Sequence, residues 1–282
     1  MTSRFGKKTL RASLVAVATA TALVLSACSG GGSSTDGEEP ADGDIGLMTD
    51  GTLVVGMNLQ YKPQMYLEDG EPTGYDVDLL NALAEDLGVE LDIQNLDFAG
   101  LIPGLQAAQF DMVSVGLGAT DERKEVISFS RGYVPYATIL AVGADSDRGN
   151  TIEDFNTEGT VIMALQGSTS EQLGKDTFPN ATITALPDQN AALLEVASGR
   201  ADAIIVEDVI LTEFNKSNGE LLKSAELSEP LSLYYGAWGV QKDNEKLIAA
   251  LDAFLCKVQE DGTLAEIYTK WLGPELPAMP AC

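Results

Sequence analysis

The chain has 282 residues, of which 43 are acidic and 17 basic, and its formal net charge is −26 at pH 7. Such acidity disfavours nucleic acid and anionic lipid surfaces as partners. The chain contains no histidine, so the usual general base and the commonest metal ligand are missing, and we expect neither a metal site nor another cofactor. The length suits one large domain or two lobes.

The first 28 residues have the layout of an export signal. Four basic residues precede an apolar stretch at 12–25, which is too short for a spanning helix of about 20 residues. The stretch ends in Leu25-Ser26-Ala27-Cys28, which resembles the lipobox of bacterial lipoproteins. The resemblance implies that residues 1–27 are a signal peptide and that Cys28 becomes a lipidated N-terminus, with palmitate as the acyl group. The alternative is an ordinary secretory signal with an incidental cysteine; both predict export.

Residues 28–50 form a predicted flexible tether. The segment is rich in Gly, Ser, Asp and Glu and poor in large apolar residues, a composition that does not bury enough apolar surface to fold. With a lipid on Cys28, the tether would hold the rest of the protein at the outer face of the cell membrane.

Regular structure is predicted from residue 52 onwards. An apolar run predicts a buried strand at 52–57, and a loop follows through 61–74. Helical spacing over 77–87 ends at Gly88, and a strand follows at 89–93. Next come a helix at 100–108, with Pro103 near its first turn, and a strand at 111–115. This alternation predicts an α/β sheet.

The same alternation begins again further along the chain. Strands are predicted at 159–165, 181–185 and 203–206, with helices opening at Gly167 and spanning 190–197. Terminal helices are predicted at 247–258 and 264–271. The β-rich segments 136–142 and 234–240 would be the two crossovers between lobes. A cleft between two lobes is a natural site for a small ligand.

Four short stretches, in their order and spacing, resemble one known family. They lie at 74–79, 100–105, 120–123 and 199–203. The chain is similar there to the periplasmic-type solute-binding proteins of ABC transporters for polar amino acids, family 3. The resemblance implies an α/β, two-lobed periplasmic-binding-protein-like fold of type II with a ligand cleft between the lobes. It places lobe 1 at 51–141 and 238–273, lobe 2 at 142–237 and a C-terminal tail at 274–282.

The family resemblance also implies residues that grip a ligand carboxylate. Arg123 would pair with the carboxylate through a planar guanidinium, and Thr120 could cap its helix. A surface ion pair with a neighbouring acid is the alternative for Arg123. The helix opening at Ser168 and Thr169 would supply N–H groups to the same anion, and a plain helix-cap role can hold there at the same time.

For the ligand ammonium, the resemblance points to the end of the strand at 203–206. Glu207 is the favoured anion, although the adjacent Asp208 could serve instead, because strand alternation turns only one of them into the cleft. Tyr61 and Phe98 match the positions whose rings sandwich the ligand side chain. Asn58 stands where many relatives carry aspartate, and this neutral amide weakens the case for a cationic side chain.

The chain departs from the family pattern at 115–118. Relatives usually carry hydroxyl side chains there, whereas this chain has Gly116 and Gly118. Both glycines could still offer backbone groups to the ligand, and we expect them to widen the pocket. A larger amino acid, a modified one or an amino-acid-like osmolyte is therefore predicted.

Cys256 and Cys282 are expected to pair, because an oxidising compartment permits disulfides and the proline-rich tail would otherwise fray. Two unrelated thiols are the alternative. We expect a monomeric binding protein that delivers its ligand to an ABC transporter permease and is not an enzyme. Two rival functions share the fold: a dehydratase and an extracellular amino-acid sensing module.

Overall fold

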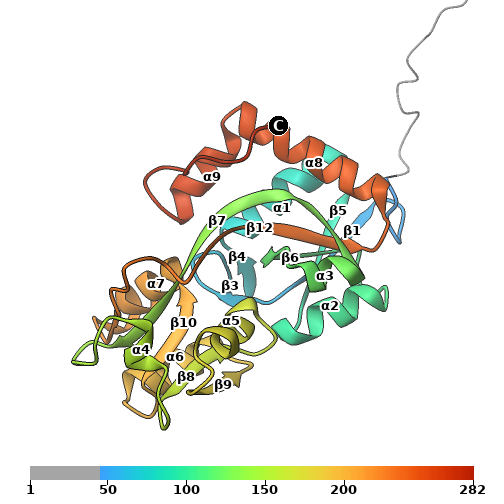
Figure 1. The fold of residues 1–282 in the computed structure, drawn as a ribbon. Helices are drawn as coiled ribbons and strands as arrows, with labels where there is room; N and C mark the ends of the chain where they lie inside the picture. Colours follow the sequence, from blue (N-terminus) through green and yellow to red (C-terminus); the bar gives the residue numbers. More distant parts are fainter. Residues whose placement is uncertain (1–44) are drawn as a thin grey trace, which may run out of the picture. The chain divides into compact units, whose positions relative to one another are not determined.

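The computed structural model describes residues 45–282. The signal peptide 1–27, Cys28 and the tether up to residue 44 lie outside the described residues. Within the described part, no helix is long and apolar enough to cross a membrane. Figure 1 shows this folded body in colour.

One nine-stranded sheet runs through the body, with strand order β5-β1-β6-β12-β7-β10-β8-β9 and β11 paired to β7. In the first half, β1 (Thr52–Met57) pairs in parallel with β5 (Glu90–Asn95) and β6 (Met112–Gly118). Helix α1 (Tyr75–Leu87) ends at Gly88 in the left-handed conformation, as the sequence predicts. Helices α2 (Phe98–Gln106) and α3 (Asp121–Val126) complete this half.

The second half repeats the alternation. Its strands are β8 (Val161–Leu165), β9 (Thr182–Leu186), β10 (Ala203–Glu207) and the short β11 (Leu222–Ser224). Its helices are α4 (Ile152–Phe155), α5 (Thr169–Thr177), α6 (Gln189–Ala197) and α7 (Asp208–Asn218). Strand β8 pairs in parallel with both β9 and β10, so this half is also an α/β unit.

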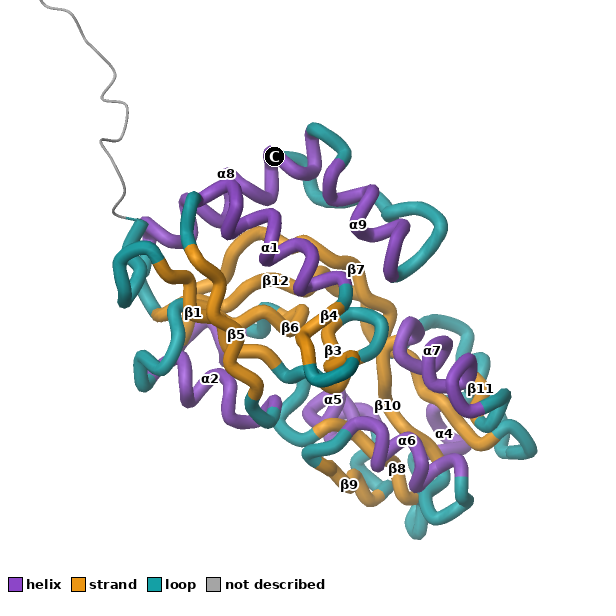
Figure 2. The backbone as a smooth tube through the Cα atoms, turned by 180° about the vertical axis from the view of Figure 1, so that it is seen from behind, coloured by secondary structure: helices purple, strands orange, loops and turns teal. Residues whose placement is uncertain are grey.

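Two long strands carry the chain between the halves. Strands β7 (Ile127–Gly143) and β12 (Ser232–Gln241) pair antiparallel, with Leu233 opposite Ala137, and the far end of β7 pairs with β10. Figures 1 and 2 show the two strands side by side from one half towards the other. The chain then returns to the first half through α8 (Glu245–Glu260) and α9 (Thr263–Trp271).

Separate apolar cores stabilise the two halves. The first half has one large core that includes Trp238, which is fully buried. The second half has two cores on opposite faces of its sheet, because successive residues of β10 point to opposite sides. Ile204 belongs to one of these cores and Ile205 to the other.

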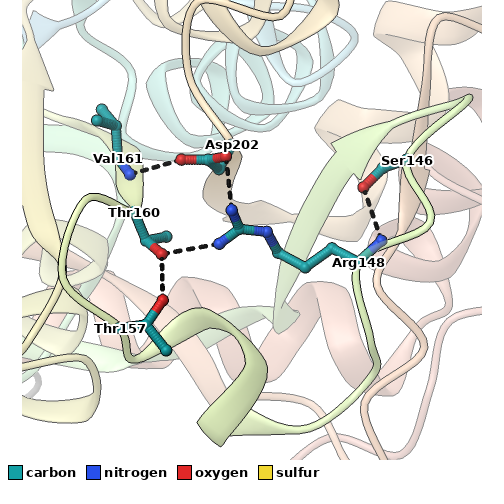
Figure 3. A network of polar contacts seen from close by, with 6 residues as sticks. All are labelled: Ser146, Arg148, Thr157, Thr160, Val161 and Asp202. Carbon is teal, nitrogen blue, oxygen red and sulfur yellow. Dashed lines mark hydrogen bonds and ion pairs between the residues drawn. The ribbon is translucent and has the colours of Figure 1, made fainter.

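A polar network fixes the start of the second half (Figure 3). Arg148 follows β7 and donates to Asp202 Oδ1 at 2.8 Å and to Thr160 Oγ1 at 2.7 Å. Asp202 Oδ2 accepts from the backbone of Val161 at 2.8 Å. The network therefore ties the end of the crossover to the first residues of β8 and β10.

The structure corrects three sequence-based expectations about the fold. Pro103 lies inside α2 and not in its first turn. The predicted loop at 61–74 contains a small antiparallel sheet of β2 (Gln60–Tyr61), β3 (Met65–Glu68) and β4 (Glu71–Thr73). The folded body also starts before the expected end of the tether, because Met48 donates to Asp111 Oδ1 at 2.6 Å.

The C-terminal tail folds back over α8. Cys282 forms a disulfide with Cys256, and their Cα atoms are 5.7 Å apart. Gln259 donates to Pro280 O at 3.1 Å, and Tyr235 donates to Ala278 O at 2.9 Å. Contacts along 278–282 thus hold a segment that has no regular structure of its own.

Candidate functional site

A small cavity lies between the two halves of the body. Residues of both halves line it, namely Tyr61, Gln64, Phe98, Val115, Gly116, Gly118, Arg123, Tyr136, Ser168, Thr169, Glu207, Ile210 and Tyr234. Its volume is about 20 Å³, which is room for roughly one water molecule. The structure therefore brings every residue predicted to bind ligand into one lining, with the exception of Asn58.

Arg123 forms the cationic end of the cavity. Thr120 caps α3 by accepting from the Arg123 backbone N–H at 3.2 Å, as expected. The guanidinium is buried and donates to Gly118 O and Gly167 O, each at 3.1 Å, and it stacks 5.8 Å from the Phe98 ring. Burial lowers the pKa of this guanidinium. Since both hydrogen bonds go to neutral carbonyls, the guanidinium forms no ion pair with an anion within the described residues.

The N-terminus of α5 lies beside Arg123. Ser168 is its N-cap: its hydroxyl accepts from Glu171 N at 3.2 Å and donates to Leu165 O at 2.7 Å. The Ser168 hydroxyl is thus committed to the helix. Thr169 is the first helical residue and lines the cavity, and nothing in residues 45–282 hydrogen-bonds to its hydroxyl. Its side chain and the free N–H groups of the first turn suit an anion.

Glu207 forms the anionic end. It is the last residue of β10, and its carboxylate accepts from the Tyr234 hydroxyl at 3.1 Å. Burial raises the pKa of the Glu207 carboxyl. Asp208 is exposed, lies outside the lining and accepts from the backbone of Val209. Strand alternation thus turns Glu207, and not Asp208, into the cavity.

Two tyrosines complete an aromatic wall that sequence analysis missed. Tyr136 and Tyr234 lie on β7 and β12, and their ring centroids are 5.2 Å apart. Together with Tyr61 and Phe98 they line the cavity. Both belong to the crossover strands, far from the family-like stretches, and only the pairing of β7 with β12 brings them to the site. Their β-rich surroundings carried no signal of ligand contact.

Gly116 does not widen the pocket, contrary to expectation. It has a φ of +61°, and a Cβ added there would lie 2.3 Å from Tyr136 Oη. The tyrosine therefore occupies the space that the missing side chain leaves. At Gly118, a Cβ would approach Thr169 Cγ2 to 3.3 Å, so that glycine permits close approach of the two halves. The expectation of an enlarged pocket was wrong.

Asn58 forms its hydrogen bonds within the first half of the body. It is buried, and its side chain donates to Leu96 O at 2.7 Å and accepts from Gln60 Nε2 at 2.5 Å. It does not line the cavity, so its side chain holds the loop after β1 and does not contact the ligand space.

Several hydrogen bonds join the two halves around the cavity. Gln60 Oε1 accepts from Gln189 N at 2.9 Å, and Gln60 Nε2 donates to Pro187 O at 3.0 Å. The Tyr61 hydroxyl donates to Gln189 Oε1 at 3.2 Å, and Arg123 reaches Gly167 in the second half. In residues 45–282, no group of three or more His, Cys, Asp or Glu side chains is placed to hold a metal ion.

Comparison with known proteins identifies the family. The family model for bacterial extracellular solute-binding proteins, family 3, matches residues 53–274. The chain is 30% identical over 266 residues to the probable amino-acid-binding protein YxeM of Bacillus subtilis (strain 168), covering 93% of this chain and 95% of YxeM.

Solved structures show the same architecture. An ancestral arginine-binding protein bound to glutamine has a TM-score of 0.74 and 31% identity, covering 80% of this chain and 99% of that one. The ancestral amino acid-binding protein AncCDT-1, a precursor of cyclohexadienyl dehydratase, has a TM-score of 0.73 and 31% identity, covering 79% and 96%. The predicted two-lobed fold is confirmed. The chain belongs to the bacterial extracellular solute-binding proteins, family 3.

Proposed function

We propose that this chain is an extracytoplasmic, lipid-anchored receptor that captures an amino acid or an amino-acid-like solute and delivers it to an ABC transporter permease. One observation carries the proposal: a buried cation, Arg123, and a half-buried carboxylate, Glu207, line the same small cavity between the two halves. An α-amino acid carries one carboxylate and one ammonium, which are the two groups that these residues would neutralise.

Different residues would bind the carboxylate, the ammonium and the side chain of the ligand. The carboxylate pairs with Arg123 and with the N-terminus of α5 at Thr169, while Ser168 keeps that helix capped. The ammonium pairs with Glu207. Tyr61 and Phe98, joined by Tyr136 and Tyr234, enclose the side chain. The backbone of Gly116 and Gly118 lines the remaining wall.

Binding would involve movement of the two halves. The cavity of about 20 Å³ is far smaller than an amino acid, although a pocket of about 770 Å³ shares Arg123, Thr169 and Tyr234 with it. Parting of the halves about β7 and β12 would enlarge the space beside Glu207. A ligand that contacts both halves binds the closed arrangement better and shifts the population towards it. The permease would recognise that closed form.

A ligand screen tests the capture function. Thermal denaturation of the purified protein with each amino acid, with betaines and with small osmolytes should reveal at least one stabilising compound. At 100 times its Kd, a ligand adds about 2.7 kcal/mol to the free energy of unfolding. If no amino acid or zwitterionic analogue stabilises the protein, the proposal fails.

The lipid anchor is tested separately. Cys28→Ser should move the protein from the membrane fraction to the medium or the soluble fraction, because the acidic body has no affinity for anionic headgroups. The matched control is Ser29→Ala, which leaves the cysteine in place. Retention of the Cys28→Ser protein on membranes would point to another anchor.

Two rival activities remain distinguishable. A dehydratase on this fold would need a poised acid near a leaving group, and Glu207 is the one carboxyl group in the described lining. Incubation of the ligand with the protein, followed by chromatography, should return it unchanged. A sensing module would signal without transport, so uptake of labelled ligand in cells lacking the protein decides between a sensor and a transport receptor.

A further inference from the structure

Gln64 is a buried cavity residue to which neither the resemblance nor the comparisons assign a role. It lies between β2 and β3, is 2% exposed and lines the cavity. Its backbone carbonyl accepts from Asp76 N at 2.9 Å, and its side-chain Nε2 donates to Asp76 Oδ1 at 3.0 Å. Gln64 and the first turn of α1 thus hold each other through two bonds.

Asp76 is a fully buried carboxylate behind the cavity wall. Besides Gln64, it accepts from Ser114 Oγ at 2.8 Å and from Tyr133 Oη at 2.7 Å. The Ser114 hydroxyl in turn accepts from Trp238 Nε1 at 2.9 Å, which directs its own hydrogen towards Asp76. All three side-chain donors are neutral, and Asp76 forms no ion pair in the described part of the chain.

Desolvation raises the pKa of Asp76 to about 6, and the three hydrogen bonds oppose that rise. The titratable groups that face Asp76 are Tyr75 on its own helix and Tyr133 and Tyr136 on β7. Burial raises the pKa of each of these phenols, so all three are neutral at pH 7. Asp76 is therefore mostly ionised at pH 7 and can only accept hydrogen bonds.

This settles which way the Gln64 amide points. Only Nε2 can face an ionised carboxylate, so the carbonyl oxygen Oε1 is turned away from Asp76. Within residues 45–282, no group donates a hydrogen bond to that oxygen, and protein atoms do not fully enclose it, so it borders the cavity that Gln64 lines. A carbonyl oxygen that borders a cavity accepts from water there, or from a ligand group that takes the place of the water.

We infer that Gln64 is a specificity-determining residue whose carboxamide oxygen accepts a hydrogen bond from the side chain of the ligand, and that Asp76 is the positioning residue that holds this amide. The inference rests on the proposed function, because Arg123 and Glu207 take the α-carboxylate and α-ammonium. The preferred ligand is then an amino acid whose side chain ends in an N–H or O–H donor, such as an amide, a hydroxyl, an ammonium or a guanidinium.

Pairs of ligands that differ in the donor test this inference. Calorimetry at pH 7.5 compares L-glutamine with L-methionine and L-arginine with L-norleucine, and L-citrulline shows whether the donor must be charged. At least one donor ligand should bind wild type about tenfold or more tighter than its apolar counterpart. Gln64→Met should reduce that ratio by about tenfold while affinity for the apolar ligand changes little. The matched control is Gln106→Met, because Gln106 is exposed on α2 and outside the cavity.

The positioning role of Asp76 is tested by a measurement that a purely structural residue would not affect. In Asp76→Asn the partner can donate as well as accept, so the Gln64 amide can turn over and the donor-to-apolar affinity ratio should fall. In wild type the same ratio should fall as the pH drops through about 6, and in Gln64→Met it should stay flat. Ratios between ligands with the same α-groups cancel the titration of Glu207. Circular dichroism and melting curves report whether Asp76→Asn folds; if it does not, the wild-type pH profile decides.

The outcomes separate this inference from the proposed function. If aliphatic amino acids bind best, or if Gln64→Met leaves the affinity ratio unchanged, the role of Gln64 is overturned while amino-acid capture stands. If no amino acid binds at all, the proposed function itself fails.

Discussion

The two charged ends of the cavity are held in different ways. Arg123 donates to two backbone carbonyls, one from each half, and stacks near Phe98. Glu207 has one side-chain donor, the hydroxyl of Tyr234. Burial acts on both, lowering the pKa of Arg123 and raising that of Glu207. The fold therefore fixes the position of the Arg123 guanidinium, whereas the Glu207 carboxylate depends more on contacts with a ligand.

The first prediction concerns Arg123, the charged residue of the cavity that the fold holds by more contacts. In Arg123→Ala the proposed carboxylate contact is lost and the two carbonyls lose their donor. Affinity for the screened ligand should fall by about a hundredfold or more, because breaking a buried charged contact costs roughly 3–5 kcal/mol. Calorimetry measures the loss. Arg200→Ala is the control, since Arg200 is exposed and pairs with Glu195. Near-native affinity in folded Arg123→Ala would remove this residue from the site.

The second prediction concerns Glu207, whose charge is removed by a side chain of nearly the same shape. Glu207→Gln keeps an acceptor for the ligand ammonium but removes the charge, so affinity should fall by roughly tenfold to a hundredfold. Asp208→Asn is the matched control, because Asp208 is exposed beside the same strand end. The same titration should give a near-native Kd for this control. A larger loss in Asp208→Asn than in Glu207→Gln would reverse the assignment of the ammonium partner.

The smallest expected effect concerns stability without ligand. Glu207 has a raised pKa in the folded state, so folding must desolvate its charge or take up a proton at neutral pH. Its unfavourable contribution is absent below the ordinary glutamate pKa of about 4.3 and grows as pH rises above it. Glu207→Gln should therefore stabilise the ligand-free protein at pH 7 by on the order of 1 kcal/mol.

The control for this effect is the same variant at pH 4. Both proteins are then neutral at this position, so their melting temperatures should converge. A Glu207→Gln protein that is less stable than wild type at pH 7 would mean that the Tyr234 bond outweighs the desolvation of the charge. The fold would then stabilise the position of Glu207 as well as it stabilises that of Arg123.

Local sequence patterns predicted most elements and the residues at their ends. Strand β1 covers the predicted residues, and Gly88, Thr120 and the Gly167–Thr169 turn end or begin helices where expected. These signals are local, because apolar spacing, caps and left-handed glycines depend on neighbours in the chain. Arg123, Thr169 and Glu207 each sit at such an element end, which is why the sequence could name them.

Packing decided the features that the sequence could not reveal. Tyr136 fills the space beside Gly116, the Asn58 amide donates to Leu96 O, and the Gln64 amide donates to Asp76. Each of these outcomes depends on partners up to tens of residues away. The sequence by itself determined which elements form and which charges they carry, because local spacing controls both. The tertiary structure alone decided which side chains share the cavity, since strand pairing such as that of β6, β7 and β12 and the packing of the two halves bring residues together that are distant in the chain.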